Sequence, residues 1–377
     1  MDTRTFRGAG ESVSLLGFGG MRFPVTGGRQ DEIDETRLQD LVDAALEGGV
    51  NYFDTAWPYH GGQSEAALGR ALRRHPRERF LYATKLPIWD VNGPADVGRL
   101  AAEQLRRCGL DRVDYYLVHC LNEEHYRRCG EHGVFGELAA LKRRGIIRRI
   151  GFSFHGAPAL LARIVADHPW EFAQIQLNCV DWSLQDAEGQ YRILEAAGLP
   201  VIVMEPLRGG NLARLPREAE AVFRRARPRD SQAAWSFRFA ASLPGVLTVL
   251  SGMETPEHLR ENLATFSPLE PLTAEDRIVL ADAVAAYRQA CRIPCTVCRY
   301  CMPCPAGVDI PRVFMVYHNY QLHRARAHLA QEHRALGPDR QADRCRRCGQ
   351  CAPKCPQRID IPAGLAEVLE ALGEEAG

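Results

Sequence analysis

The chain has no net charge and no long apolar run. Its 47 lysines and arginines are balanced by 47 aspartates and glutamates, which removes any global attraction to nucleic acid. No stretch approaches the ~18 consecutive apolar residues that span a bilayer. The first ten residues, MDTRTFRGAG, lack the apolar core of a secretion signal. These absences predict a cytoplasmic protein without a nucleic-acid or membrane partner, in a compartment where thiols stay reduced.

Cysteine, in contrast, is abundant and unevenly placed. Of the 13 cysteines, eight form two tight runs near the C-terminus: Cys295, Cys298, Cys301, Cys304 and Cys345, Cys348, Cys351, Cys355. Each run ends in Cys-Pro, which is the ligand pattern of two-cluster [4Fe-4S] ferredoxins. Zinc ribbons usually pair two CxxC knuckles, and disulfides need an oxidising compartment, so both alternatives are weaker. The second run has the stricter spacing, because the last gap of the first run is one residue short.

The two runs predict two clusters with exchanged ligands. In two-cluster ferredoxins the fourth cysteine of each run binds the other cluster. One cluster would then be held by Cys295, Cys298, Cys301 and Cys355, and the other by Cys345, Cys348, Cys351 and Cys304. Both runs continue into similar text, PAGVDIP and PQRIDIP, which is an internal repeat. We predict a small α-helical dicluster ferredoxin-like domain over 286–377, with helix over 312–335 between the runs.

The larger part of the chain alternates apolar strands with amphipathic helices. Its 377 residues, 46% of them hydrophobic, suffice for one large domain plus a small one. Helical segments such as TRLQDLVDAALEGG carry apolar residues three and four apart and end in glycine. Eight strand-then-helix units predict a (β/α)8 TIM barrel over 1–285, with a doubly wound open sheet as the weaker alternative. The strands are expected at 15–20, 50–54, 80–85, 113–119, 147–154, 171–178, 199–206 and 245–252.

Four polar residues lie at or near the ends of the predicted strands, where barrel enzymes carry their catalytic groups. They are Asp54, Tyr59, Lys85 and His119. Taken singly, each has an ordinary structural explanation, such as capping or solvation. Together they form a chemical set, because an ammonium lowers the pKa of a neighbouring phenol and a carboxylate fixes the ammonium. Tyrosine would then act as the acid, and the imidazole would orient a carbonyl for hydride attack.

These residues and their surroundings resemble the aldo-keto reductase family. GGVNYFDTAWPYHGGQSEAALGRAL is similar to the family signature around Asp54 and Tyr59, and VDYYLVH to the strand that carries the histidine. The complete chain resembles the subgroup with a C-terminal ferredoxin domain. The resemblance implies an NADP- or NAD-linked oxidoreductase that reduces a small-molecule carbonyl or oxidises an alcohol.

The resemblance also places the nicotinamide cofactor. It implies that Ser153 and Gln174 hold the carboxamide, and that Glu261 and Asn262 lie near the adenine. Met204 takes the place of the aromatic residue that stacks on nicotinamide. Two further departures bear on the cofactor. Phe154 replaces the asparagine that usually follows the serine, and Gly252 and His258 replace the basic residues on the ribose phosphate.

Joining the two halves raises a redox question. Nicotinamide gives up two electrons as a hydride, an iron-sulfur cluster takes one at a time, and a flavin is the usual converter. No flavin motif is visible, because GGMRFPVTGG does not lie in a βαβ unit. The clusters are structural or regulatory, or the barrel hosts a flavin or a one-electron substrate, or a ferredoxin or flavoprotein partner completes the circuit. Basic residues are available to dock such a partner: Arg344, Arg346, Arg347, Lys354 and Arg358.

A second function class stays open at this point. The chain would be an electron-transfer or redox-sensing protein whose barrel no longer uses nicotinamide. Trp57, Trp89 and Trp182 are candidate walls of a substrate pocket, although tryptophans more often pack in cores. The sequence does not indicate the substrate, the electron partner or the oligomeric state.

Overall fold

A computed structural model describes residues 1–6, 10–323 and 326–373 of the chain. These form two compact units: Met1–Pro206 with Phe237–Pro271, and Leu207–Ser236 with Leu272–Gly377. The second unit therefore takes in a segment that follows a barrel strand in sequence. The domain boundary at 285/286 stays a prediction.

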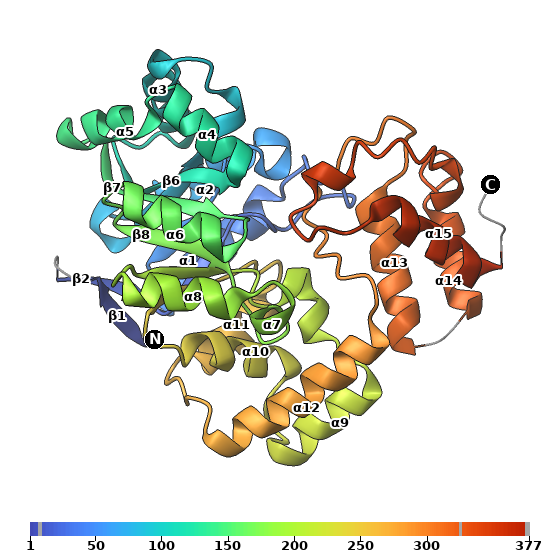
Figure 1. Ribbon diagram of the computed structural model, residues 1–377. Coiled ribbons are helices and arrows are strands. Elements are labelled where there is room, and N and C mark those ends of the chain that lie inside the picture. The colour runs from blue at the N-terminus through green and yellow to red at the C-terminus, as the bar shows by residue number, and fades with distance from the viewer. Residues whose placement is uncertain (7–9, 324–325, 374–377) are drawn as a thin grey trace. The chain divides into compact units, whose positions relative to one another are not determined.

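The first unit contains a closed parallel barrel (Figure 1). Its strands follow one another around the barrel in chain order, and the last pairs with the first, which confirms the predicted TIM-barrel fold. Every predicted strand segment overlaps one of them. They are β3 (Leu16–Gly19), β4 (Tyr52–Asp54), β5 (Leu81–Leu86), β6 (Val113–Leu121), β7 (Ile147–Phe154), β8 (Phe172–Gln176), β9 (Val201–Met204) and β10 (Val246–Ser251).

The helices between the strands are amphipathic. α1 (Glu35–Glu47) buries Leu38, Leu41 and Val42 along one side. α3 (Pro94–Cys108) begins with proline and ends at Gly109, whose φ of 64° is readily adopted by glycine. The other helices assigned to this unit are α2 (Ser64–Leu72), α4 (Glu123–Glu131), α5 (Val134–Arg143), α6 (Pro158–Asp167), α7 (Asp181–Leu184), α8 (Ala187–Ala196) and α11 (Pro256–Thr265), while α10 (Gln232–Ala241) runs across the boundary.

An antiparallel hairpin closes one end of the barrel. Its strands are β1 (Thr3–Phe6) and β2 (Glu11–Ser14), and the sequence did not predict them. Phe6 packs on Tyr115 with ring centroids 5.9 Å apart, in a cluster that includes Leu81 and Phe172, the first residues of β5 and β8. The hairpin therefore covers the amino ends of the strands. The carboxyl ends remain for functional side chains.

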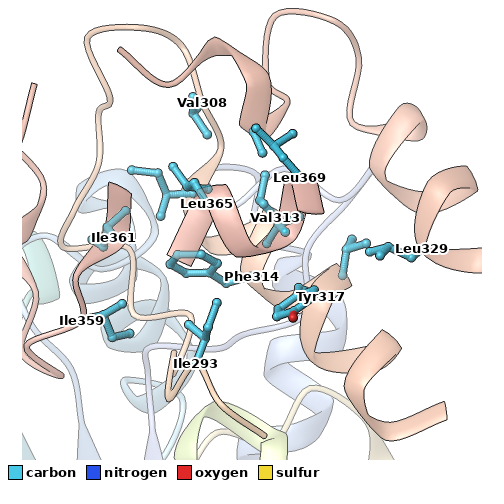
Figure 2. Packing of buried hydrophobic residues seen from close by; sticks show 14 residues of the cluster. Ile293, Val308, Val313, Phe314, Tyr317, Leu329, Ile359, Ile361, Leu365 and Leu369 are labelled. Atoms are coloured by element: carbon cyan, nitrogen blue, oxygen red, sulfur yellow. The ribbon is translucent and has the colours of Figure 1, made fainter. Parts of the chain in front are cut away.

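The second unit is helical and has its own core. It contains α9 (Arg217–Ala226), α12 (Ala274–Ala290), α13 (Ile310–His323), α14 (Arg326–Ala335) and α15 (Ile361–Leu372). Figure 2 shows Phe314 of α13 and Leu365 of α15 in the buried cluster, against which several of the cysteines pack. The described residues of the segment 312–335, which was predicted to be helical, all lie in α13 and α14, and residues 324–325 lie outside the described ranges. Within the described ranges, no helix is long and apolar enough to cross a membrane.

Candidate active site and cluster sites

The four predicted catalytic residues lie near the carboxyl ends of neighbouring barrel strands. Asp54 ends β4, Lys85 is next to last in β5, and His119 lies two residues before the end of β6. All three are at least 97% buried. Tyr59 begins a 3-10 helix, Tyr59–Gly62, after β4 and is partly exposed. Tyr59 is therefore the member of the set that an arriving molecule can reach.

Lys85 is the centre of this group. Its Nζ donates to Asp54 Oδ1 at 2.6 Å and to the carbonyl oxygen of Thr55 at 2.8 Å. The same atom lies 4.9 Å from the ring centroid of Tyr59. The rings of Tyr59 and His119 meet edge to face, with centroids 6.0 Å apart. The structure thus brings together the four residues that the sequence selected, while their catalytic roles stay predictions.

Burial dominates the acid-base properties of the group. Burial raises the pKa of Tyr59, and the opposing effect of Lys85 does not overcome it. Our expectation of a lowered tyrosine pKa was therefore wrong, because the sequence did not show how dry the surroundings are. For Lys85, burial disfavours the ammonium, but its interactions with Asp54 and Tyr59 outweigh this and raise its pKa. Burial likewise raises the pKa of Asp54, against the opposing contacts with Lys85 and Gln174.

His119 is a neutral imidazole in this setting. Burial lowers its pKa well below the ordinary value, and the positive charge of Lys85 adds to the effect. Trp89 packs beside it, with ring centroids 5.1 Å apart. Of the tryptophans proposed as pocket walls, Trp89 is thus next to the group. Trp57 instead stacks on the guanidinium of Arg107 at 3.4 Å, and Trp182 packs edge-on against Phe239.

A buried polar network contacts the backbone of Lys85. Gln104 of α3 donates from Nε2 to the carbonyl oxygen of Lys85 at 3.0 Å and to Glu65 Oε1 at 2.6 Å. Glu65 of α2 is fully buried and also accepts from Thr84 Oγ1 at 2.6 Å. Neither Glu65 nor Gln104 was predicted from the sequence. The available signal was a glutamate and a glutamine among the apolar positions of two amphipathic helices.

The predicted nicotinamide residues divide into two groups. Gln174 of β8 donates from Nε2 to Asp54 Oδ2 at 3.1 Å, and Ser153 of β7 accepts from the backbone N–H of Cys120 at 2.8 Å. Both lie on strands near the catalytic group. Asn262 of α11 donates to Ser251 Oγ at 3.0 Å, next to exposed Glu261.

The positions that depart from the family pattern are also placed. Phe154 is buried in the protein interior, where it contacts Phe152. Met204 ends β9 and is partly exposed. Gly252 directly follows β10, His258 lies in the first turn of α11, and both are exposed. None of these observations tests the cofactor assignment, which stays a prediction.

The cysteines of the second unit gather at two pockets. Cys295, Cys298, Cys301 and Cys355 line one of them. The other is lined by Cys345, Cys348, Cys351 and Cys304, and it also touches Cys301. These are the two ligand sets that exchange of the fourth cysteine predicts. In the described ranges no three His, Cys, Asp or Glu side chains converge on a single metal ion. Thiols spaced around a pocket suit a cluster, in which each thiolate binds a different iron.

The two cysteine runs share the same backbone conformation. The residues that flank Cys298 have φ of 56° and 67°, and those that flank Cys348 have 51° and 73°. After the fourth cysteines, Gly307 N donates to Cys304 O and Arg358 N donates to Cys355 O, each at 3.0 Å. Alternating left-handed residues of this kind turn backbone N–H groups toward an anionic centre. The residues present therefore fit two clusters related by an internal repeat.

A segment from another part of the sequence contacts the start of the first run. Arg208, which is fully buried, donates to the carbonyl oxygen of Pro294 at 2.8 Å. Asn211 donates to the carbonyl oxygen of Cys295 at 2.7 Å. Both belong to the 3-10 helix Arg208–Ala213, which follows β9 in the chain.

Comparison with known proteins agrees with this geometry. Residues 15–278 match the model of the Aldo/keto reductase family, and residues 294–359 match that of the 4Fe-4S dicluster domain. The chain therefore belongs to the aldo/keto reductase family and carries a 4Fe-4S dicluster domain.

Individual relatives match the barrel part of the chain. A probable aldo-keto reductase 1 of Glycine max is 28% identical over 209 residues, which are 53% of this chain and 58% of the relative. The NADH-specific methylglyoxal reductase of Escherichia coli K12 is 27% identical over 281 residues, 61% of this chain and 83% of the relative. The chain thus spans just over half the length of the Glycine max relative.

A solved structure shows the same fold. The holo form of an aldo-keto reductase from Bacillus halodurans superposes with a TM-score of 0.63 at 24% identity, covering 77% of this chain and 99% of that one. At this identity the likeness concerns the fold alone.

Proposed function

We propose that this protein is an oxidoreductase that reduces a small-molecule carbonyl, or oxidises the corresponding alcohol, with Tyr59 as the general acid and base. The observation that carries the proposal is the buried Lys85–Asp54 ion pair beside a partly exposed Tyr59. An ion pair of this kind is costly to bury, and it is commonly retained where a site needs perturbed pKa values.

The residues divide the proton chemistry among them. Tyr59, with a raised pKa, keeps its proton at neutral pH and gives it from Oη to the carbonyl oxygen as negative charge develops there. The ammonium of Lys85 stabilises the phenolate that is left, and Asp54 holds the ammonium in place. Neutral His119 orients the carbonyl oxygen by a hydrogen bond. The carbonyl gains a hydride and this proton, and the product is an alcohol.

NADP or NAD is the proposed hydride source. Ser153, Gln174, Met204, Glu261 and Asn262 are the residues assigned to it. The Escherichia coli relative is named as specific for NADH, and Gly252 and His258 offer no lysine or arginine for a ribose phosphate. Both points favour NADH.

Two [4Fe-4S] clusters are proposed for the second unit, each held by the four cysteines that line one pocket. Bound clusters would supply single electrons. Because no flavin motif is present in the sequence, we propose that an external one-electron carrier serves them. Residence in the cytoplasm, where thiols stay reduced, is part of the proposal.

The second candidate function is an electron-transfer or redox-sensing protein whose barrel no longer binds nicotinamide. Two departures from the family pattern that the resemblance implies favour it: Phe154, which is buried, replaces an asparagine, and Met204 replaces an aromatic residue.

Substitution of Tyr59 by phenylalanine separates the two functions. We expect carbonyl reduction, measured anaerobically with NADH or NADPH and methylglyoxal or other aldehydes, to fall about 10²–10⁴-fold, as general acid catalysis contributes. The visible iron-sulfur absorption should be unchanged. A matched control is Tyr126→Phe, which removes an exposed hydroxyl bonded to Asp167. Full activity in Tyr59→Phe would contradict the assigned role, and no activity in the unmodified protein would favour the second function.

A further inference from the structure

The second cysteine run lies at a strongly basic surface. Cys348, its second cysteine, is exposed. Five cationic side chains around the run are also exposed: Arg344, Arg346, Arg347, Lys354 and Arg358. None of the five forms an ion pair or a side-chain hydrogen bond with any residue that the structure describes. Their charges are therefore available to an external partner. We call these five side chains and Cys348 the basic surface.

The first run has different surroundings. Its equivalent cysteine, Cys298, is only partly exposed. Arg299 beside it lies 3.4 Å from Asp309, and exposed Arg292 lies 4.0 Å from Glu367. Arg292 and Arg299 thus have acidic neighbours within the protein. Since the two runs share one backbone pattern, the unpaired charge of the second run is not a requirement of cluster binding.

The chemistry of the basic surface favours one kind of partner. Unpaired cations attract an acidic protein and orient it during encounter. Because Cys348 is exposed, a cluster bound to it would lie near the protein surface, at a short electron-transfer distance from a docked protein. Residues 339–360 contain no aromatic side chain on which nucleic-acid bases could stack. The exposed large apolar side chains of the described residues, Leu184 and Ile278, lie outside this segment and offer it no membrane anchor.

We propose that the basic surface docks an acidic one-electron carrier protein, of the ferredoxin or flavodoxin charge class, beside Cys348. The proposal rests on the proposed function in one respect, namely that the cysteines hold clusters. One electron leaves the reduced carrier, which is oxidised by one, and reduces the protein by one, with no proton transferred. The carrier supplies electrons singly, which nicotinamide does not.

The first test measures binding and needs no turnover. The protein, purified anaerobically with its clusters, is titrated with an oxidised plant-type [2Fe-2S] ferredoxin in a calorimeter at low and at moderate salt. We expect binding that weakens as salt increases, because exposed charges are screened beyond about 10 Å at 0.1 M ionic strength. The double variant Arg346→Glu/Arg347→Glu should raise the dissociation constant at least tenfold.

A matched control is available in the barrel. Arg143 and Arg144 are also adjacent and exposed, and Arg143→Glu/Arg144→Glu makes the same change in net charge. We expect it to bind ferredoxin as the unmodified protein does. Equal weakening in both double variants would mean that net charge alone acts, and would overturn the proposal.

Two further measurements keep the test decisive. If Arg346→Glu/Arg347→Glu loses iron, Arg344→Glu/Lys354→Glu replaces it, with iron content and visible absorption as the check. A redox titration of each variant then separates docking from tuning. A shifted midpoint potential with unchanged ferredoxin binding would show that the arginines tune the cluster, and would overturn the proposal.

Three further outcomes would each contradict either the docking proposal or the cluster assignment. Binding to phosphatidylserine vesicles that the arginine pair controls, with no ferredoxin binding, would overturn the proposal in favour of a membrane surface. A protein purified without iron would contradict the cluster assignment in the proposed function. Cluster-loaded protein whose ferredoxin binding ignores the arginine pair would overturn the docking proposal alone.

Discussion

The barrel site and the second cysteine run use charge in opposite ways. In the barrel, Asp54 and Lys85 are buried and paired at 2.6 Å, and Tyr59 and His119 take their protonation states from that dry setting. At the second run, Arg346 and its neighbours are exposed, without acidic partners among the described residues. Buried charge controls proton affinity, whereas exposed charge controls encounter with other molecules.

This difference predicts how each site responds to change. A buried pair contributes little when intact, but removing one partner leaves a charge that nothing compensates. An exposed cation that makes no contact contributes almost nothing to folding. Substitutions should therefore separate the two sites by their effect on stability, with the largest loss at the buried pair and the smallest at the exposed cations.

Breaking the buried pair should have the largest effect. Lys85→Met leaves Asp54 buried without its cation, and we expect the free energy of unfolding of the barrel to fall by about 3–5 kcal/mol. Denaturation in urea, followed by circular dichroism, measures it. Arg106→Met is the control, because Arg106 forms an exposed pair with Glu103 at 2.7 Å, and exposed pairs contribute little to stability. Equal losses in the two variants would contradict the contrast between buried and exposed charge.

Because His119 is buried, the folding stability of the barrel should decrease at acidic pH. The pKa of His119 is lowered in the folded protein, so below about pH 6.5 the unfolded chain binds a proton that the folded protein does not. The stability that this histidine contributes is present above that pH and is lost as the pH falls. The loss is at most about 1.4 kcal/mol per pH unit for one group.

The variant His119→Asn should accordingly lose less stability than the unmodified protein between pH 6.5 and pH 5. Urea denaturation at several pH values measures the slope. His328→Asn is the matched control, because His328 of α14 is exposed. If both variants keep the slope of the unmodified protein, His119 is not held neutral by burial.

Much of the fold could be predicted from sequence because its signals are local. Strands such as VDYYLVH, buried along their whole length in β6, appear as continuous apolar runs, and the cysteine runs depend on spacing alone. The hairpin β1–β2 was missed because its strands have four residues each and mix polar with apolar types.

The residues of the barrel site could be predicted from the sequence, but the directions of their pKa changes could not. Asp54, Lys85 and His119 stand out because polar residues end apolar strands. The direction of the pKa change at Tyr59 depends on the competition between burial and Lys85, which sequence does not show. Glu65 and Gln104 were missed for a related reason. In an amphipathic helix a polar residue is usually solvated, and only the packing of α2, α3 and β5 places these two inside.

A substitution in the 3-10 helix Arg208–Ala213, which contacts the first cysteine run, should have a moderate effect on stability. Asn211→Ala removes the hydrogen bond to the carbonyl oxygen of Cys295, and we expect about 0.5–1.5 kcal/mol of destabilisation in the second unit. Iron-sulfur absorption should bleach at lower guanidinium concentration than in the unmodified protein. Gln341→Ala is the control, since Gln341 makes an exposed, longer bond of 3.3 Å to Arg334 O. Earlier bleaching in the control than in Asn211→Ala would contradict a specific role for this segment.

The smallest effect should come from the basic surface itself. Arg346→Glu/Arg347→Glu changes the net charge by four, yet we expect its unfolding free energy to stay within about 0.5 kcal/mol of that of the unmodified protein, as for substitutions away from buried features. Denaturation followed at the iron-sulfur band measures this on the samples used for ferredoxin binding. A large loss of stability would mean that these arginines hold the second run together, and their effect on binding would then follow from damaged structure. Unchanged stability with lost binding would assign their charge to an external partner, in contrast to the charge of Lys85, which acts inside the barrel.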